Sequence, residues 1–278
     1  MCYNVSVGLG CHIDPDNFEL DPIQKEERRR CWAGLMMLHM IQSTFLGNPA
    51  PSWRISNSVK LPADANDFDI TLDGINTTFN SPTQMSYLLY QYRLFDITTE
   101  ICNEIFNKTP PARHTIESLD SKICTIQETW EKQYLQESAY QQPLSTHHSV
   151  HLNLLHGYAH QLFLLLHRPF FAQSVYGLAT PNESQIRCIA SAEALLDIHK
   201  MFCDDAIYIP YKWYTNGLGS FHAFHASVVL AVALQQSIYS NQHYKFRKML
   251  EDTLQRFDSN SAGSRMCLKA AKILRFLL

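Results

Sequence analysis

Residues 21–46, DPIQKEERRRCWAGLMMLHMIQSTFL, open with the pattern of a helix N-terminus. The Asp21 side chain can accept a hydrogen bond from the N–H of Gln24, and the Gln24 side chain can reach back to the N–H of Asp21. Pro22 suits the first helical position because its missing N–H would have no partner there. This stretch therefore predicts a helix that begins at Pro22.

The same order of cap, proline and Gln or Glu occurs twice more, in SPTQ at 81–84 and in TPNE at 180–183. The expected caps there are Ser81 and Thr180. The chain has no alternating apolar segment long enough to build a sheet. Three helix starts of this kind therefore predict an all-α fold.

The spacing of the apolar residues predicts about eight helices in a multi-helix irregular array. Their expected ranges are 22–46, 82–107, 115–137, 146–168, 181–203, 220–239, 243–257 and 263–278. The breaks between them, at 107–115, 140–146 and 204–220, have the composition of loops within a helical array. We therefore expect residues 1–278 to form a single α-helical domain.

An apolar run stops at LLLHRPFF, residues 164–171. Pro169 disfavours the helical conformation at Arg168, which predicts that the helix ends there. His167 and Arg168 would then lie in the last turn, where cations favour the helix dipole and can bond free carbonyl groups. This interpretation makes the triplet a helix stop, and the alternative is a catalytic role for His167.

The composition excludes several classes of protein. Hydrophobic residues make up 46% of the 278 residues and charged residues 18%, and the formal net charge is -3, so no strong field attracts nucleic acid or an anionic membrane. The longest apolar stretch, residues 226–234, is far shorter than the roughly 20 residues of a spanning helix. None of the eight cysteines forms a C-x-x-C pair, and the N-terminus is not that of a secretory signal. We expect an intracellular protein that does not contact a membrane.

Histidines are concentrated in one predicted helix, at His147, His148, His151, His156, His160 and His167. The spacing of His156 and His160 could place both on one metal, but the zinc protease motif needs Glu after the first His, and that position is Gly157. His222 and His225 form a second close pair. We assign no catalytic, cofactor-binding, metal-binding or DNA-binding residue, and we expect no cofactor and no enzymatic activity.

A basic run, Arg28 to Arg30, follows two glutamates on the predicted helix 22–46. On a helix, these arginines can form ion pairs with acidic residues three or four positions away. We therefore interpret the run as a solvated helix face, rather than as a nucleic-acid contact or an import signal. The later segment with Asp64, Asn66, Asp67 and Asp69 reads as a loop whose side chains cap turns or pair with nearby Arg. It lacks the ligand order of a calcium loop.

Three segments in the same order carry a resemblance to a known family. They are VGLGCHIDPDNFELDPIQKEERRRCWAGLMMLHMIQSTFLGNPAP at 7–51, VKLPADANDFDI at 59–70 and LLLHRPFF at 164–171. Together they resemble the fungal-specific transcription factor domain, or middle homology region, of binuclear zinc cluster (six-cysteine) transcription regulators. Position 33 is Ala where the family often has an aromatic residue, and His39 and Met40 replace its usual Asp-Arg.

The resemblance implies a nuclear regulatory domain that modulates transcription, with a metabolic or biosynthetic gene set as the target. The zinc cluster and the first part of the domain are missing from this sequence, so we expect a partial domain that does not bind specific DNA sites by itself. Expected partners are a full-length transcription factor or another regulatory protein, and a small-molecule effector could be a further partner.

Two other classes of function stay open from the residues alone. One is a helical enzyme or metal-binding protein that uses the His147–His167 cluster, and the other is a helical scaffold or interaction protein. A partial domain should also leave apolar side chains without cover, at Trp32, Leu35, Leu38, Leu154, Leu162 and Leu165. Uncovered apolar surface favours self-association.

Overall fold

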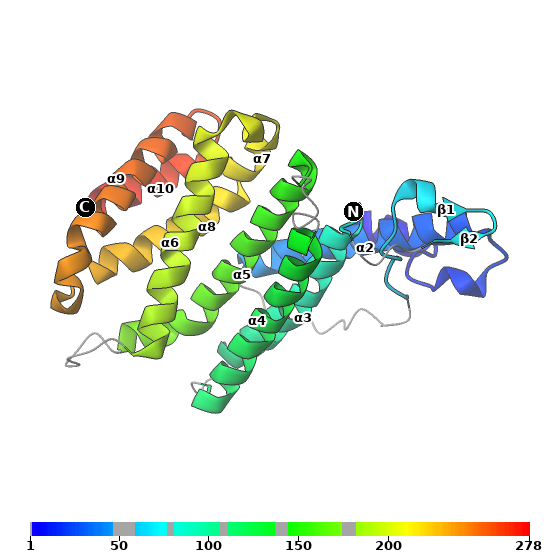
Figure 1. Cartoon of the computed structure of the whole chain (residues 1–278), viewed down its shortest axis with the longest axis horizontal. Coiled ribbons are helices and arrows are strands. Elements are labelled where there is room, and N and C mark those ends of the chain that lie inside the picture. Colours follow the sequence, from blue (N-terminus) through cyan, green and yellow to red (C-terminus); the bar gives the residue numbers. More distant parts are fainter. Residues whose placement is uncertain (1, 47–58, 77–80, 106–110, 137–143, 174–181) are drawn as a thin grey trace. The chain divides into compact units, whose positions relative to one another are not determined.

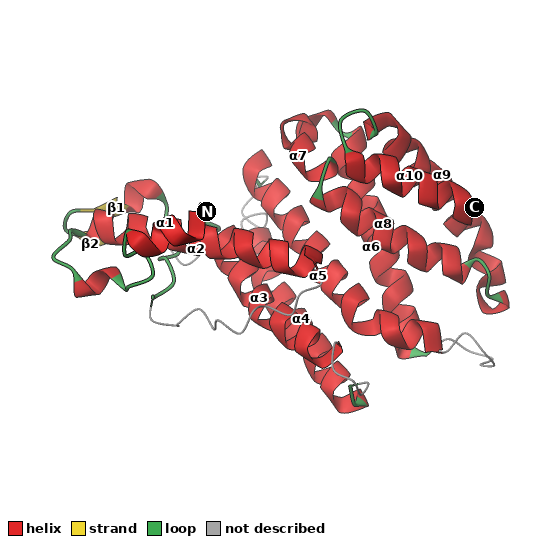
Figure 2. Cartoon of the chain, turned by 180° about the vertical axis from the view of Figure 1, so that it is seen from behind, coloured by secondary structure: helices red, strands yellow, loops and turns green. Residues whose placement is uncertain are grey.

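The computed structural model describes residues 2–46, 59–76, 81–105, 111–136, 144–173 and 182–278. The chain divides into two compact units, residues 1–155 and residues 156–278, and each is described here by itself. Both units are built from helices, and Figure 2 shows strand only in one short hairpin. The predicted all-α fold is therefore confirmed.

Among the described residues, four α-helices and one short hairpin lie wholly in the first unit, and their course can be followed in Figure 1. The elements are α1 (Cys2–Gly8), the 3-10 turn η1 (Pro15–Asn17), α2 (Pro22–Leu46), the 3-10 turn η2 (Asp67–Asp69), β1 (Ile70–Thr71), β2 (Gly74–Ile75), α3 (Ser86–Ile105) and α4 (Arg113–Gln136). The two strands are antiparallel, with Ile70 opposite Ile75 and Thr71 opposite Gly74. Helix α5 (Thr146–Gln173) begins in this unit and continues into the second.

The described part of the second unit contains the rest of α5 and five further α-helices. They are α6 (Glu183–Asp204), α7 (Lys212–Thr215), α8 (Leu218–Ala233), α9 (His243–Asn260) and α10 (Arg265–Leu277), with 3-10 segments η4 (Ala206–Tyr211) and η5 (Ser237–Gln242). One apolar core joins α6, α8, α9 and α10, and it includes Leu195, Leu230, Phe246, Phe257 and Leu274. The predicted loop 204–220 is therefore largely helical, and the predicted helix 220–239 ends early, at Ala233.

Helix caps differ from the sequence expectation at two of the three starts. The N–H of Gln24 donates to Asp21 at 2.8 Å, which confirms the first cap. Helix α3 begins at Ser86 rather than at Pro82, and in the turn before it Oγ1 of Thr83 accepts from the N–H of Met85 at 3.0 Å, so the expected start with Ser81 as its cap is wrong. Helix α6 is capped by Asn182 in a capping box with Gln185, and the expected cap Thr180 lies outside the described residues. In α6 the observed cap lies two residues after the predicted one.

The predicted stop at Arg168 is wrong, because α5 runs through Pro169 to Gln173. Proline removes one helical hydrogen bond and crowds the preceding turn, but only one turn of helix follows it here. Phe171, in that last turn, is buried in the core of the second unit. Burial of this ring offsets the unfavourable backbone, so tertiary packing overrides the local signal. His167 is buried against Ser184, with Nδ1 3.1 Å from Oγ, and Arg168 is exposed.

Most of the apolar side chains that we expected to lack cover are covered. Trp32 is buried, and Tyr3 and Val7 of α1 pack against it together with Leu35. Leu154 and Leu162 are also buried, and Leu165 is partly buried. Leu38 is 63% exposed, so the expected loss of cover applies to this residue.

No single helix among the described residues is long and apolar enough to cross a membrane. Helix α8 and the segment Ser237–Asn260 satisfy the length and composition limits as a pair, with a bend of 116° between them.

Candidate functional site

Helix α2 carries a buried carboxylate, Glu26, one turn before Arg30. Glu26 is 1% exposed, and its Oε1 accepts hydrogen bonds from Nε of Arg30 and from the N–H of Ala63, both at 3.0 Å. Residues four apart share one face of a helix, so the pair is built into the local structure. A buried carboxylate needs such a partner, because an isolated charge in an apolar interior is very unfavourable.

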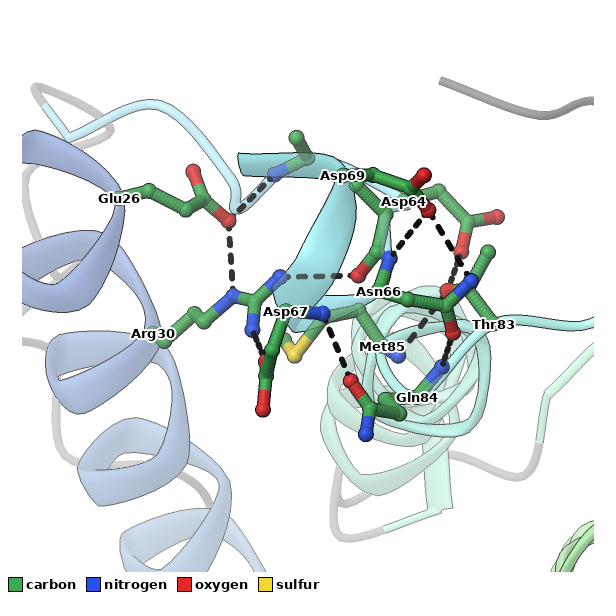
Figure 3. A network of polar contacts seen from close by, with 11 residues as sticks. Glu26, Arg30, Asp64, Asn66, Asp67, Asp69, Thr83, Gln84 and Met85 are labelled. Atoms are coloured by element: carbon green, nitrogen blue, oxygen red, sulfur yellow. Dashed lines mark hydrogen bonds and ion pairs between the residues drawn. The ribbon is translucent and has the colours of Figure 1, made fainter. Parts of the chain in front are cut away.

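The Arg30 guanidinium continues from this pair to the loop at 63–69 (Figure 3). Its Nη1 lies 2.6 Å from Oδ1 of Asp67, and its Nη2 donates to the carbonyl of Ala65 at 2.9 Å. The planar fork of arginine can serve three acceptors at once, which the single ammonium of lysine cannot match in geometry. The expectation that the acidic loop pairs with a nearby arginine is confirmed for Asp67.

The same loop is fixed to the start of α3 by a reciprocal pair of hydrogen bonds, also visible in Figure 3. The N–H of Asp67 donates to Oε1 of Gln84 at 2.8 Å, and the N–H of Gln84 donates to Oδ1 of Asn66 at 3.1 Å. Within the loop, Oδ2 of Asp69 accepts from the N–H and the side-chain amide of Asn66. These contacts confirm that the polar loop residues cap turns.

Asp64 joins the loop to two further helices. Its Oδ1 accepts from Oγ1 of Thr83 at 2.5 Å and from Oγ of Ser86 at 2.7 Å, both at the N-terminus of α3. Its Oδ2 accepts from Nε2 of Gln133 on α4 at 3.4 Å. We call the set Glu26, Arg30, Asp64, Asn66, Asp67, Asp69, Thr83, Gln84, Ser86 and Gln133 the Arg30 network. It connects α2, α3 and α4 through one loop.

A second cluster of charges lies on the neighbouring face of α2. Arg29 pairs with Asp14 at 3.2 Å and with Asp16 at 2.8 Å, and Lys60 pairs with Asp16 at 2.8 Å. Burial raises the pKa of Asp14, but hydrogen bonds from the backbone N–H groups of Asp16 and Lys60 and the Arg29 guanidinium outweigh it, so this pKa is lowered. The hydrogen bond from Lys60, with the help of Arg29, lowers the pKa of Asp16 to about 2.

Each of the three consecutive arginines therefore has a different neighbour. Arg28 lies over the ring of Phe18, at 5.5 Å from its centroid, while Arg29 and Arg30 bind the two acidic clusters. Consecutive helical residues point about 100° apart, so three of them cannot share one partner. The interpretation of this run as a solvated face is wrong for Arg29 and Arg30, whose side chains are largely buried in ion pairs. The role of Asp14 was not predicted, and its position before Pro15, as a turn cap, was the available signal.

The chemistry of the Arg30 network is that of a structural clamp. Glu26, Arg30 and Asp67 face opposite charges or backbone groups, and Asp64 is bonded to the hydroxyls of Thr83 and Ser86 and to the amide of Gln133. Within the described ranges, no group of three or more His, Cys, Asp or Glu side chains is placed to hold a metal ion. One buried acceptor, Oε2 of Glu26, has no hydrogen-bond partner among the described residues.

The predicted histidine cluster is spread along α5 in separate surroundings. His147 contacts His151, whose ring stacks on Tyr87 at 4.4 Å, and His148 meets the edge of Tyr134. Burial, with the neighbouring histidines, lowers the pKa of His151 to about 3. In the second unit His160 lies 3.4 Å from Oγ of Ser191, and burial lowers its pKa to about 4. The described part of the chain thus does not gather these residues into one site.

Sequence reasoning also missed a buried polar cluster around His199 in the second unit. His199 Nε2 lies 3.1 Å from Oγ of Ser220 and 3.6 Å from Sγ of Cys203, and Ser220 also accepts from Cys267 at 3.2 Å. Burial lowers the pKa of His199 to about 3 and raises that of Cys203 to about 11. A neutral thiol beside a neutral imidazole is not an activated nucleophile. The spacing of His199 and Cys203, four residues apart, was the signal for this cluster.

Comparison of the chain with models of known protein families finds a match to one family. Residues 1–137 match the model of the fungal specific transcription factor domain. Over these residues the chain is similar to that family. The matched residues contain all of the Arg30 network and the second charged cluster, formed by Asp14, Asp16, Arg29 and Lys60.

Two relatives extend the similarity beyond this domain. The chain is 22% identical to an uncharacterized transcriptional regulatory protein, C1F7.11c, of Schizosaccharomyces pombe, over 83% of this chain and 30% of that protein. It is 23% identical to the pyrrolocin cluster transcription factor fsdR of a fungal species, strain NRRL 50135, over 99% of this chain and 39% of that protein. The chain therefore spans between three and four tenths of the length of these relatives. No solved structure matches.

Proposed function

We propose that this chain is a regulatory region of a fungal transcription regulator, acting through protein contacts and without reading DNA itself. The observation that carries the proposal is the family match of residues 1–137, together with the similarity of nearly the whole chain to two fungal regulators. In this proposal the chain works in the nucleus and has no enzymatic activity.

The charges of the family domain support a role other than DNA contact. Residues 1–155 contain 11 Lys and Arg against 18 Asp and Glu, a net charge of -7. Two of its arginines, Arg29 and Arg30, are already bound to carboxylates of the same unit. Affinity for DNA rests largely on free cations that neutralise phosphates, and an acidic surface opposes that contact.

The Arg30 network supports the proposal as the feature that holds the family domain together. One loop, at 63–69, ties α2 to α3 and α4, so any partner that binds this unit meets a preorganised surface. The name of one relative refers to a pyrrolocin cluster. That name supports a metabolic or biosynthetic gene set as the target proposed for this chain. A small-molecule effector is a further part of the proposal.

The test is a reporter experiment in a fungal cell. The chain is fused to a DNA-binding domain of known site, and a reporter with that site is measured against the DNA-binding domain alone. We expect a change of several-fold in expression, lost in the Arg30→Ala fusion and kept in the Arg113→Ala fusion, whose arginine is exposed and pairs one turn away with Glu117. Equal expression with and without the chain, at equal protein levels, would contradict a regulatory role.

A further inference from the structure

Helix α10 presents a basic stripe to the solvent. The stripe consists of Arg265, Lys269, Lys272 and Phe276, which are all exposed. Their spacing of four, three and four residues places them along one side of the helix. The opposite side is buried in the core of the second unit through Cys267, Ala270, Ala271 and Leu274. The packing of α10 therefore fixes which residues face outward.

The cations of this stripe are not neutralised within the described residues. Helix α10 contains no Asp or Glu, and none of Arg265, Lys269 and Lys272 takes part in an ion pair among the described residues. Arg275, at the edge of the stripe, differs, because it pairs with Asp258 of α9 at 2.8 Å. Three unpaired cations along one helix give a local positive potential that favours an acidic partner.

Large apolar side chains are mixed with these cations. Phe276 is 89% exposed and lies on the stripe itself, and Leu268 and Ile273 are partly exposed on its two sides. Aromatic residues are enriched among those that dominate protein–protein binding. A partner must therefore supply apolar side chains as well as carboxylates.

We propose that the exposed face of α10 is a docking site for an acidic amphipathic segment of a partner protein. Two or three carboxylates of the segment meet Arg265, Lys269 and Lys272, and an apolar side chain covers Phe276. The proposal goes beyond the regulatory function above. The surface lies in the second unit, and the argument for its partner does not depend on a transcriptional role.

The distribution of charge favours a short acidic peptide over a long polyanion. Residues 156–278 contain 12 Lys and Arg against 8 Asp and Glu, a net charge of +4, but Glu251 and Asp258 lie exposed on the adjacent helix α9. DNA or an anionic membrane covers a wide area and would bring its own charges near these carboxylates. A peptide that binds along one helix face avoids them.

The experiment uses the purified full chain and a labelled synthetic peptide of about 16 residues, roughly four helical turns, with Asp and Glu on one side and Leu and Phe on the other. Fluorescence anisotropy reports binding. We expect the affinity to fall about tenfold or more in the Lys269→Glu/Lys272→Glu double variant, and also in Phe276→Ser. The double variant should gain affinity for a peptide with Lys in place of Asp and Glu.

The matched controls lie on α9. Lys248→Glu changes an exposed lysine and Tyr244→Ser changes an exposed aromatic residue, and both variants should bind the acidic peptide as the original chain does. Circular dichroism and the unfolding midpoint verify that all variants are folded. Because the substituted side chains are exposed, neither should change.

Several results would overturn the proposal. One is equal binding of the acidic peptide to the α10 variants and to the original chain, or no binding to either. Another is that the α10 variants lose binding only to duplex DNA, or only to phosphatidylcholine vesicles that contain phosphatidylserine. A third result comes from light scattering. If the original chain forms dimers and the α10 variants are monomers, the exposed face of α10 binds a second copy of this chain instead of a partner protein.

Discussion

At the scale of single residues, Arg30 is the side chain whose loss should matter most to the first unit. It neutralises the buried Glu26 and also holds Asp67 and the carbonyl of Ala65. Removing one partner of a buried ion pair leaves the other charge without compensation, which costs about 3 kcal/mol. We therefore expect Arg30→Ala to lower the free energy of unfolding by about that amount, measured by urea denaturation.

The control for this variant is Arg113→Ala, in the same unit. Arg113 and Glu117 also form a pair four residues apart, with an N–O distance of 2.7 Å, but both side chains are largely exposed. Exposed pairs contribute at most about 1 kcal/mol. Equal losses of stability in the two variants would show that burial of Glu26 is not the reason for the effect.

At the scale of the element, Pro169 defines a testable property of α5. The helix continues for one turn beyond this proline, so the chain tolerates a missing backbone hydrogen bond and a crowded preceding turn. In Pro169→Ala both defects disappear, although the unfolded chain gains some entropy. We expect a net gain in stability of about 1 kcal/mol or more, measured as a higher urea midpoint.

Pro22 provides the opposite case for comparison. It occupies the first position of α2, where proline costs no hydrogen bond and its fixed backbone angle suits the helix. Pro22→Ala should therefore leave stability unchanged or lower it slightly. If both variants gained stability by a similar amount, the position of proline in the helix would not explain the result.

At the scale of the whole molecule, buried histidines should make the second unit sensitive to mild acid. The pKa values of His199 and His222 are lowered to about 3 and those of His160 and His225 to about 4, in each case first by burial. The unfolded chain takes up protons near pH 6.5, whereas these folded side chains do not. Stability is therefore lost as the pH falls from 6.5 toward 4.

The expected loss is about 1 kcal/mol for each of these histidines between pH 6.5 and 5.5, measured as the change in urea midpoint. The slope of the urea midpoint against pH should decrease in His225→Gln. This variant keeps a polar group beside Gln161, the neighbour of His225 at 3.0 Å. His114→Gln, at an exposed position, should leave the slope as it is. A flat pH profile would show that the buried histidines do not control this behaviour.

The sequence by itself determined the features that depend on neighbours within one helical turn. The all-α class, the start of α2 at Pro22 with its Asp21 cap, and the pairing of Glu26 with Arg30 all follow from spacings of three or four residues. The resemblance to the fungal transcription factor domain could also be read from the sequence. Three motifs in one order are specific even where each motif alone is a weak signal.

Only the tertiary structure decided the features in which distant residues compete with local preference. The partners of Arg30, at Ala65 and Asp67, lie 35 and 37 positions away, and no local rule selects them from other acceptors. The burial of Phe171 carries α5 past Pro169, and Thr83, in the turn before α3, is bonded to the distant Asp64. Local propensities differ by about 1 kcal/mol for most residues, so a few buried contacts outweigh them.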